Sequence, residues 1–555
     1  MPIKLLIVGG VAGGATAAAR ARRIDERAEI ILFERGEHIS FANCGLPYYI
    51  GDIIKRRNDL LVTTPRAFKE RYNIDIRVFH EVVSIDRSSK TVEVRDIKAG
   101  KSYRESYDKL ILSPGAEPLK PPITGIDQDR IFTLRNIPDT DRIKTFVDTA
   151  HPASAVVVGG GFIGLEMVEN LAARGVKTTI IEMLNQVMPP LDYEMAAIIQ
   201  AHLTEKGVLC ELENRVTGFS KSGDKIIVST EKGRAIECDM VILSIGIKPE
   251  NALARAAGLD LGERGGIKVN ASLQTSDPDI FAVGDAVEMK DIVTGAPVMT
   301  PLAGPANKQG RVAADNALGR KSLFNGTLAT AIAKVFDLTV ASTGNSEKTL
   351  KRLKIPYQVS HTHSGSNASY YPGATMMSIK LIFSPDSGRI LGAQIVGEKG
   401  VDKRIDVIAT AIHGQMTVYD LEELELSYAP PYSSAKDPVN IAGFVAANLI
   451  KGDVENVYWD ELSGLDSSEA VLVDLRTKKE QEKEGIIEGA IHIPVDQLRA
   501  RLGELNKTKT HVLFCAVGLR GYVAHRILLQ NGFKSKNLSG GFRLYKNIRG
   551  KSSND

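Results

Sequence analysis

The sequence predicts an α/β fold in which one strand–turn–helix–strand unit occurs twice. The first copy runs from Ile3 to Glu34 and the second from Ser154 to Glu182, about 150 residues later. Each begins with a short apolar run that leads into a glycine-rich turn, as parallel βαβ units do. At 555 residues the chain is too long for a single hydrophobic core, so we expect roughly three or four domains.

The first unit opens with an apolar strand from Ile3 to Val8, followed by an alanine-rich helix and a second strand, Glu29 to Phe33. Its turn, Gly9-Gly10-Val11-Ala12-Gly13-Gly14, has Val11 where the usual motif has its middle glycine. We expect the remaining glycines to form the turn and the carboxylate of Glu34 to accept hydrogen bonds from a ribose. The cofactor-binding residues predicted here are Gly9, Gly13, Gly14 and Glu34.

The second unit contains a complete G-x-G-x-x-G motif between strand Ala155–Val158 and a helix that extends to Arg174. These glycines permit a tight turn and close approach of a pyrophosphate, which the helix N-terminus stabilises. The next strand, Thr178 to Ile181, ends at Glu182, whose charge would repel a 2′-phosphate and so favours NADH over NADPH. The nucleotide-binding residues predicted here are Gly159, Gly161, Gly164 and Glu182.

The pattern changes in the second half of the chain. From about Asn325 to Pro438, strands such as Met376–Phe383 and Ile390–Val396 precede a helix near Asp402–His413, which predicts an α+β domain. A polar stretch, Lys451 to Glu461, separates this region from a short α/β module that opens at Ala470-Val471-Leu472-Val473-Asp474-Leu475-Arg476. We expect Gly550–Asp555 to be a disordered tail.

Composition excludes several classes of protein. The hydrophobic fraction is 43%, the charged fraction 25% and the net charge +3, so nothing indicates a nucleic-acid or membrane partner. No apolar run reaches the roughly 18 residues that a transmembrane helix needs, and the N-terminus enters a strand directly, without the pattern of a signal peptide. Four cysteines (44, 210, 238 and 515) argue against a disulfide framework and for a cytoplasmic location.

Cys44 is the most informative residue of the chain. It stands in Ser40-Phe41-Ala42-Asn43-Cys44-Gly45-Leu46-Pro47-Tyr48-Tyr49, shortly after the first nucleotide-binding unit and with no other cysteine nearby. We expect it at the start of a helix, where the helix N-terminus and neighbouring donors would lower its pKa and yield a reactive thiolate. Cys515 lies in a different setting, and two such thiols in one chain suggest sulfur chemistry.

Further segments carry a resemblance to a known family. Thr275-Ser276-Asp277-Pro278-Asp279-Ile280-Phe281-Ala282-Val283-Gly284-Asp285 is similar to the second flavin motif of two-dinucleotide-domain reductases, and Leu112–Ala116 and Ser244–Pro249 are similar to their interdomain crossovers. Residues 1–445 therefore resemble the FAD-dependent pyridine nucleotide-disulfide reductases. The resemblance implies that Asp285 binds the FAD ribityl chain and that Ser113 and Gly115 lie at the cofactor; a helix N-cap is the alternative for Asp285.

The same resemblance implies domain boundaries. Two Rossmann-like domains would come first, one for FAD (1–113 and 244–324) and one for NAD(P)H (114–243). An α+β dimerisation domain (325–445) and a linker (446–456) would follow.

The lone cysteine is similar to that of the coenzyme A-disulfide reductase branch, because Tyr49 stands where other branches have a second cysteine, five residues on. This implies a homodimer that binds coenzyme A, in which two tyrosines reach the partner's cysteine. The substrate-binding residues it implies are Thr16, Arg20, Arg23, Ser40, Asn43 and Lys436, and the two tyrosines are Tyr370 and Tyr428. Alternatives stay open: a solvated helix face for Arg20 and Arg23, packing for the tyrosines, and Tyr371 or Tyr432 in their place.

The C-terminal segment, 457–550, resembles a rhodanese domain. Leu472–Arg476 and Gly489-Ala490-Ile491-His492-Ile493-Pro494 are similar to its opening motifs, and Cys515-Ala516-Val517-Gly518-Leu519-Arg520 is similar to its active-site loop. Backbone N–H groups around such a loop form an anion cradle suited to a thiolate or persulfide, and Arg520 adds positive charge. A purely structural module is the alternative.

These observations predict an NADH-dependent flavoenzyme that reduces coenzyme A persulfide, polysulfide or coenzyme A disulfide through Cys44. Cys515 would relay sulfane sulfur, and no metal is expected. A first alternative is an NADH oxidase or peroxidase that uses Cys44 as a sulfenic acid, although Ala12 stands where those relatives carry histidine. The second is plain coenzyme A-disulfide reduction, with the rhodanese-like tail serving only as a sulfur carrier, and the third is a non-enzymatic flavin redox sensor. For the pyridine nucleotide, NADPH is the alternative to NADH.

Overall fold

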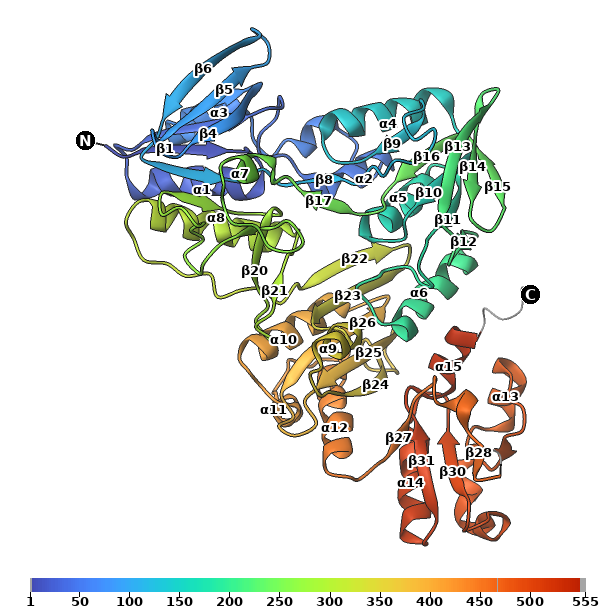
Figure 1. The fold of residues 1–555 in the computed structure, drawn as a ribbon. Helices are drawn as coiled ribbons and strands as arrows, with labels where there is room; N and C mark the ends of the chain where they lie inside the picture. The colour runs from blue at the N-terminus through green and yellow to red at the C-terminus, as the bar shows by residue number, and fades with distance from the viewer. Residues whose placement is uncertain (1, 467, 550–555) are drawn as a thin grey trace. The chain divides into compact units, whose positions relative to one another are not determined.

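The computed structural model describes residues 2–466 and 468–549, so the tail predicted at 550–555 lies outside the described residues. The chain forms two compact units. Unit 1 comprises Met1–Val187 and Val208–Ala329, and unit 2 comprises Met188–Gly207 and Thr330–Asp555. Figure 1 shows the elements of each unit with the labels used below.

The first sheet of unit 1 is parallel and has the order β19-β7-β1-β2-β3. Its strands are β1 (Lys4–Val8), β2 (Glu29–Glu34), β3 (Asp75–Val78), β7 (Lys109–Leu112) and β19 (Ile280–Ala282). β19 is thus far in sequence from the other four strands, which all lie within residues 4–112. β1, β2, β7 and β19 are apolar runs buried on both faces, as parallel sheets require, whereas the edge strand β3 is only half-buried. Helix α1 (Ala12–Ile24) packs against α8 (Ala303–Ala317) beside it.

The second sheet of unit 1 is also parallel and has the order β12-β11-β10-β16-β9. Its strands are β9 (Ile131–Thr133), β10 (Ser154–Val158), β11 (Lys177–Ile181), β12 (Leu209–Glu211) and β16 (Met240–Leu243). Helix α5 (Phe162–Ala173) follows the complete glycine motif and packs on β10 and β11. Both predicted βαβ units are therefore confirmed.

The two predicted crossover segments pair with each other. β8 (Ala116–Pro118) and β17 (Ile247–Pro249) pair as an antiparallel ribbon. Unit 1 also contains two antiparallel three-stranded sheets. They are formed by β4 (His80–Asp86), β5 (Thr91–Asp96) and β6 (Lys101–Ser106), and by β13 (Val216–Ser222), β14 (Lys225–Thr230) and β15 (Ala235–Cys238).

Unit 2 contains the predicted α+β region. Its antiparallel sheet has the order β22-β23-β26-β25-β24. The strands are β22 (Ala331–Val335), β23 (Leu338–Gly344), β24 (Gln358–Gly365), β25 (Met376–Phe383) and β26 (Ile390–Gly397). Helices α10 (Val401–His413) and α12 (Pro438–Ile450) pack on it, and α6 (Tyr193–Glu205), although it follows β11 in the chain, contacts β26.

The last sheet is parallel, with the order β27-β31-β30-β28-β29. Its strands are β27 (Asn456–Val457), β28 (Ala470–Asp474), β29 (Ile491–His492), β30 (Thr510–Phe514) and β31 (Lys534–Leu538). Its helices are α13 (Lys478–Glu484), α14 (Leu519–Gln530) and α15 (Gly541–Arg549). The sheet corrects the expected linker 446–456: α12 continues to Ile450 because its apolar face is buried, and β27 already pairs with β31.

The predicted α/β class, with an α+β region and a final α/β module, is confirmed. Within the described part of the chain, no helix is long and apolar enough to cross a membrane.

Candidate active site

The first glycine turn is packed so tightly that side chains cannot replace its glycines. A Cβ atom on Gly9 would lie 2.1 Å from the carbonyl oxygen of Ser113, and one on Gly14 would lie 1.8 Å from that of Gly9. Gly9 also has a φ of +98°, which favours glycine. Ser113 thus lies directly against the turn, where its own N–H donates to Val8 at 2.8 Å. The glycines bring the start of α1 close to β1, as phosphate binding at a helix N-terminus requires.

Val11 does not disrupt this turn. It precedes the first residue of α1 with φ −102° and ψ 175°, extended backbone that any residue adopts. Gly161 occupies the equivalent position before α5 with φ −79° and ψ −170°. The two turns therefore have the same backbone course despite the missing glycine.

Each turn is fixed by the acidic residue at the end of the following strand. Glu34 accepts the N–H groups of Gly10 and Gly36 at 2.9 and 2.8 Å. Glu182 is buried and accepts those of Gly160 and Leu184 at 2.8 and 2.9 Å. A carboxylate has about four acceptor positions, so both groups retain capacity for ribose hydroxyls.

The second turn has the free space that a pyrophosphate needs. A Cβ atom on Gly161 would have no other atom within 4 Å, whereas one on Gly159 would lie 2.4 Å from the Ser244 carbonyl oxygen. Gly164 is equally constrained, with the Gly159 carbonyl 2.1 Å from its Cβ position. Two glycines therefore allow close packing, and the third leaves the turn open to a ligand.

The Cys44 loop is hydrogen-bonded to the first glycine turn. The N–H of Ser40 donates to the Gly10 carbonyl at 2.9 Å, and that of Ala42 donates to Leu60 at 2.8 Å. Cys44 lies in a short 3-10 turn, Asn43–Gly45, that leads into helix α2 (Leu46–Ile50), and its side chain is exposed. The predicted position at a helix start is confirmed, and the thiol is accessible.

The expectation that local donors lower the pKa of Cys44 is wrong. Partial burial raises the pKa of this thiol, and the carboxylates of Glu166 and Asp285 raise it further because they repel a thiolate. Helix α2, which follows, has only five residues, so the dipole at its N-terminus does little to lower the pKa of the thiol.

Two residues that the sequence analysis missed lie beside this thiol. Burial raises the pKa of Glu166, on α5, to about 7, and the Tyr48 hydroxyl, on α2, hydrogen-bonds to this carboxyl group. Burial also raises the pKa of Tyr48 to about 12, so Tyr48 keeps its proton. Two signals could have found them: Tyr48 stands four residues after Cys44, and Glu166 two residues after the last motif glycine.

Asp285 is not a helix N-cap, because it lies between β19 and β20 (Val287–Lys290) and no helix starts there. Burial raises the pKa of its carboxyl group, and the charge of Arg135 opposes this shift. The preceding Gly284 N–H donates to the buried side chain of Gln309 at 2.7 Å. The loop is thus fixed from α8, and the Asp285 carboxylate influences Cys44.

The residues predicted for coenzyme A have unequal surroundings. Arg20 is not on a solvated face: its Nε donates to Asp315 on α8 at 2.8 Å. Thr16 hydrogen-bonds to Asn307 on the same helix. Arg23 and Asn43 are exposed, and Ser40 has a φ of +47°. Of the two arginines predicted for coenzyme A, Arg23 is therefore more accessible to a phosphate than Arg20.

In unit 2 the two predicted tyrosines lie together. The Tyr370 and Tyr428 hydroxyls are 2.9 Å apart, although both side chains are exposed. Lys436 is exposed on the loop before α12, and its carbonyl accepts the Ser434 hydroxyl at 2.6 Å.

Cys515 lies on the predicted strand-to-helix loop between β30 and α14. Its side chain is fully buried, and the N–H of Gly518 donates to its sulfur at 3.1 Å. Arg520 donates to Glu480 through both terminal nitrogens at 2.8 and 2.5 Å. This pairing raises the pKa of Arg520, and the nearby Cys515 adds to the shift. Glu480 is in turn fixed by a capping box with Thr477 at the start of α13. A thiolate on this loop thus has an N–H donor and a guanidinium beside it.

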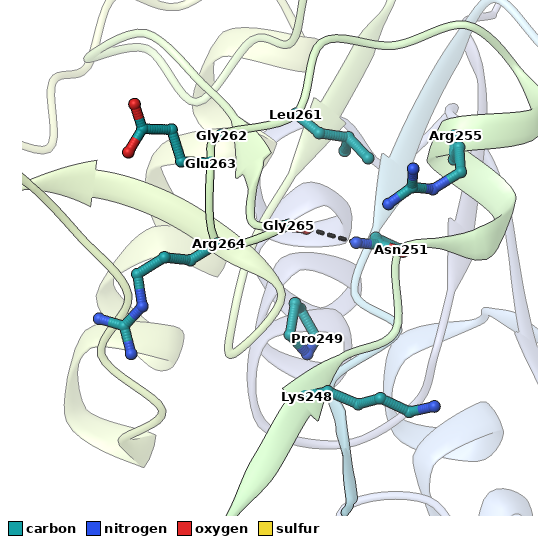
Figure 2. Close-up of a pocket in the computed structure, with 9 residues that line it drawn as sticks. All are labelled: Lys248, Pro249, Asn251, Arg255, Leu261, Gly262, Glu263, Arg264 and Gly265. Atoms are coloured by element: carbon teal, nitrogen blue, oxygen red, sulfur yellow. Dashed lines mark hydrogen bonds between the residues drawn. The ribbon is translucent and has the colours of Figure 1, made fainter.

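A pocket of about 500 Å³ is lined by none of the predicted site residues. Figure 2 shows the residues that line it. Asn251 donates to the Gly265 carbonyl across it at 2.6 Å, while Arg264 and Glu263 point away from Asn251. Lys248 at its edge pairs with Glu117 at 3.0 Å. We assign it no role in the chemistry.

Comparison with known families decides the assignment. Residues 3–310 match the model described as pyridine nucleotide-disulphide oxidoreductase, and residues 330–438 match the dimerisation domain of the same family. The chain belongs to the pyridine nucleotide-disulphide oxidoreductase family. Residues 459–548 match a rhodanese-like domain. The predicted flavin and pyridine nucleotide are the cofactors of this family, and the chain is an oxidoreductase.

Similar proteins include members with and without the last domain. Coenzyme A disulfide reductase of Staphylococcus haemolyticus is 39% identical over 447 residues, 80% of this chain and 100% of that protein. The crystal structure of reduced Bacillus anthracis CoADR-RHD is 53% identical, with a TM-score of 0.96 over 99% of this chain and 98% of that one. A NAD-dependent persulfide reductase from A. fulgidus is 39% identical, with a TM-score of 0.92 over 98% and 100%.

Proposed function

We propose that this oxidoreductase uses NADH and FAD to reduce coenzyme A persulfide, polysulfide or coenzyme A disulfide through Cys44. The observation that supports this most directly is the Cys44 thiol itself. It is accessible, lies on a loop hydrogen-bonded to the first glycine turn and forms no disulfide. A reductase with one cysteine at its site takes the second sulfur of the disulfide from its substrate.

The residues of unit 1 fit the two cofactors. The first turn, with Glu34, Ser113, Gly115 and Asp285, would hold FAD. The second turn, with the open space at Gly161 and the carboxylate of Glu182, would hold NADH. FAD supplies two-electron transfer chemistry when bound.

Cys44 carries the sulfur chemistry. Its thiolate attacks the sulfur attached to coenzyme A, the S–S bond of the persulfide breaks, and hydrosulfide leaves and takes a proton. The new disulfide between Cys44 and coenzyme A is then cleaved with one electron pair, which returns the Cys44 thiolate and releases coenzyme A after protonation. Burial raises the pKa of Glu166 to about 7, so near neutral pH this group beside the thiol exists in both its protonated and its charged form.

Coenzyme A is proposed because relatives along the whole flavoprotein part are coenzyme A disulfide reductases. In unit 1, Arg23 on α1 presents an exposed cation suited to its phosphates, Thr16 and Arg20 lie on the same helix, and Ser40 and Asn43 lie on the Cys44 loop. In unit 2, Lys436 is exposed as well. We infer a homodimer, in which Tyr370 and Tyr428 act on the partner's thiol, and a cytoplasmic location.

Cys515 would carry sulfane sulfur. Its thiolate attacks a terminal polysulfide sulfur, forms a cysteine persulfide and releases the shortened polysulfide anion. The Gly518 N–H and the Arg520 guanidinium would stabilise the negative charge of both forms.

Anaerobic steady-state kinetics test this function. NADH oxidation is measured with coenzyme A persulfide, polysulfide, coenzyme A disulfide and, separately, oxygen. We expect at least one sulfur substrate to exceed oxygen in kcat/KM by more than about tenfold. Faster turnover with oxygen than with every sulfur substrate would instead make the protein an oxidase.

A further inference from the structure

Two histidines on strand β24, the buried His361 and the half-buried His363, have no place in the chemistry described so far. They stand two residues apart and so project from the same face of the strand. Each is hydrogen-bonded at both ring nitrogens. In each ring, one of these bonds goes to the segment Ser539–Gly541, which follows β31 in the rhodanese-like domain.

His363 binds the backbone of this segment. Its Nε2 lies 3.0 Å from the Gly540 carbonyl oxygen, and its Nδ1 lies 2.8 Å from the Ser378 hydroxyl on the neighbouring strand β25. A carbonyl only accepts, so Nε2 donates and Nδ1 accepts from Ser378. Burial, with the charge of Arg543 and the ring of His361, lowers the pKa of His363 to about 3, so the ring stays neutral as this pattern requires.

His361 connects the same segment to a buried charge network. Its Nδ1 lies 2.9 Å from the Ser539 hydroxyl, and its Nε2 lies 3.1 Å from Glu194 on α6. Glu194 pairs with Lys380 on β25, a fully buried lysine that also pairs with Asp192 at 2.9 Å and with Glu347. Removing one member of such a network leaves a buried charge without compensation, so the network fixes the position of Glu194 and, through it, His361.

The segment Ser539–Gly541 forms one wall of the Cys515 loop. The N–H of Phe542 donates to the Cys515 carbonyl at 2.8 Å, and that of Arg543 donates to Ala516 at 3.0 Å. A Cβ atom on Gly541 would lie 2.6 Å from the same Cys515 carbonyl, and Gly541 has a φ of +60°. There is no free space between the segment and the loop, so a shift of one displaces the other.

Further contacts hold the domain against the same surface. Leu544 and Ile548 of α15 pack with Ala197 of α6. The Tyr458 hydroxyl donates to the Val359 carbonyl on β24 at 2.9 Å.

We propose that His361 and His363 are positioning residues for Cys515: they hold Ser539–Gly541 against β24 and thereby fix the loop that carries the thiol. This inference rests on the proposed role of Cys515 as a sulfur carrier, and it places two determinants of that role outside the rhodanese-like domain. Sulfur loading on Cys515 therefore depends on docking to the dimerisation domain.

The chain offers a matched pair of variants for the test. Ser539→Ala removes the hydroxyl that bonds His361. Ser535→Ala removes a second buried hydroxyl, which bonds Nδ1 of His525 at 3.0 Å within the rhodanese-like domain itself. Both are made in the full-length holoenzyme with Cys44→Ser, Cys210→Ser and Cys238→Ala, so that Cys515 is the one thiol left and the added sulfur is measured on it alone.

Loading of Cys515 by polysulfide is followed by intact mass, and backbone hydrogen exchange is followed across 515–521. We expect Ser539→Ala to slow loading and to speed exchange of these amides, each by about threefold to tenfold, the range that loss of one buried hydrogen bond gives. Ser535→Ala should leave both close to the parent values. Equal loading and exchange in the two variants would overturn the inference.

A second comparison excludes a merely structural effect. His363→Gln keeps a side-chain N–H for Gly540 and an acceptor for Ser378, whereas His363→Leu keeps neither. We expect Gln to retain most of the loading rate and Leu to lose it. If the parent enzyme takes no sulfur at all on Cys515, the relay itself fails, and the exchange measurement still decides whether the histidines fix the loop.

Discussion

The hydroxyl groups of Tyr370 and Tyr428 form a hydrogen bond with each other, with their oxygens 2.9 Å apart, on an exposed surface of the dimerisation domain. The bond from Tyr370 raises the pKa of Tyr428. Exposed tyrosines have no packing reason to meet, and the adjacent Tyr371 and Tyr432 do not form this hydroxyl pair. The pairing supports Tyr370 and Tyr428 as the residues that act on a sulfur anion.

Tyr428→Phe should therefore reduce kcat for coenzyme A persulfide by about tenfold or more, because a hydrogen bond to an anionic sulfur is lost. Tyr370→Phe should have a smaller effect, since it removes only the partner of Tyr428. Tyr371→Phe and Tyr432→Phe are the matched controls, expected within about twofold of the parent enzyme. A larger loss in either control than in Tyr428→Phe would reassign the site by one neighbour.

Cys44→Ser should retain bound FAD and lose reduction of both persulfide and disulfide. The serine oxygen cannot form the mixed disulfide, whereas the glycine turns that hold the cofactors do not involve the thiol. Flavin absorbance of the purified variant and anaerobic NADH oxidation check the two parts. Substantial turnover by this variant would exclude Cys44 as the essential thiol.

The pH at which the Cys44 thiol ionises should depend on the charge of Glu166. The Glu166 carboxylate raises the pKa of the thiol by repulsion, and its own pKa is about 7. Glu166→Gln removes this charge, so the pKa of Cys44 should fall, and the pH profile of Cys44 alkylation by iodoacetamide should move to lower pH. Asp285, which also faces the thiol, is unchanged by the substitution.

Glu169→Gln is the control for that measurement. Glu169 lies on the same helix and raises the pKa of Glu166, whereas Glu166 itself raises the pKa of Cys44. Glu169→Gln should therefore leave the pH profile of Cys44 alkylation nearly unchanged. An alkylation profile that is the same in Glu166→Gln and in the parent enzyme would contradict the coupling of the two groups.

The sequence predicted those parts of the site that local patterns encode. Glycine spacing identified both nucleotide turns, because strand, turn and helix follow one another within about 30 residues. The environment of Cys44 could not be predicted in this way, since Glu166 reaches the thiol only through the packing of α2 against α5. The pairing of Arg20 with Asp315, 295 residues apart, and the bonds of His361 and His363 to Ser539 and Gly540 are likewise set by tertiary structure.

Glu182 should make the enzyme prefer NADH over NADPH, because its carboxylate would meet a 2′-phosphate with like charge at a cost of about 1–3 kcal/mol. This corresponds to a ratio of about 5 to 150 in kcat/KM for the two cofactors. Glu182→Gln should reduce the ratio. It should also weaken binding of both cofactors, since Glu182 accepts the backbone N–H groups of Gly160 and Leu184. Equal kcat/KM for NADH and NADPH in the parent enzyme would show that another residue overrides this carboxylate.

The last prediction separates the tasks of the two thiols. Cys515 lies in unit 2, on the loop between β30 and α14, and Cys44 lies in unit 1, on the loop bonded to the first glycine turn. Cys515→Ser should therefore leave the flavin site intact and largely preserve reduction of coenzyme A disulfide and preformed coenzyme A persulfide. Reduction of polysulfide, where sulfane sulfur must first be loaded, should fall by about tenfold or more.

Hydrogen sulfide release under anaerobic conditions, measured for Cys515→Ser and Cys44→Ser on both classes of substrate, distinguishes the possible outcomes. Cys44→Ser should be inactive on both, because every route ends at that thiol. If Cys515→Ser is unimpaired on every sulfur donor, the relay is wrong and the rhodanese-like domain has another task. If Cys515→Ser abolishes disulfide reduction as well, the two sites are coupled. The substitution changes only the sulfur atom of Cys515, which lies beside the Gly518 N–H and Arg520.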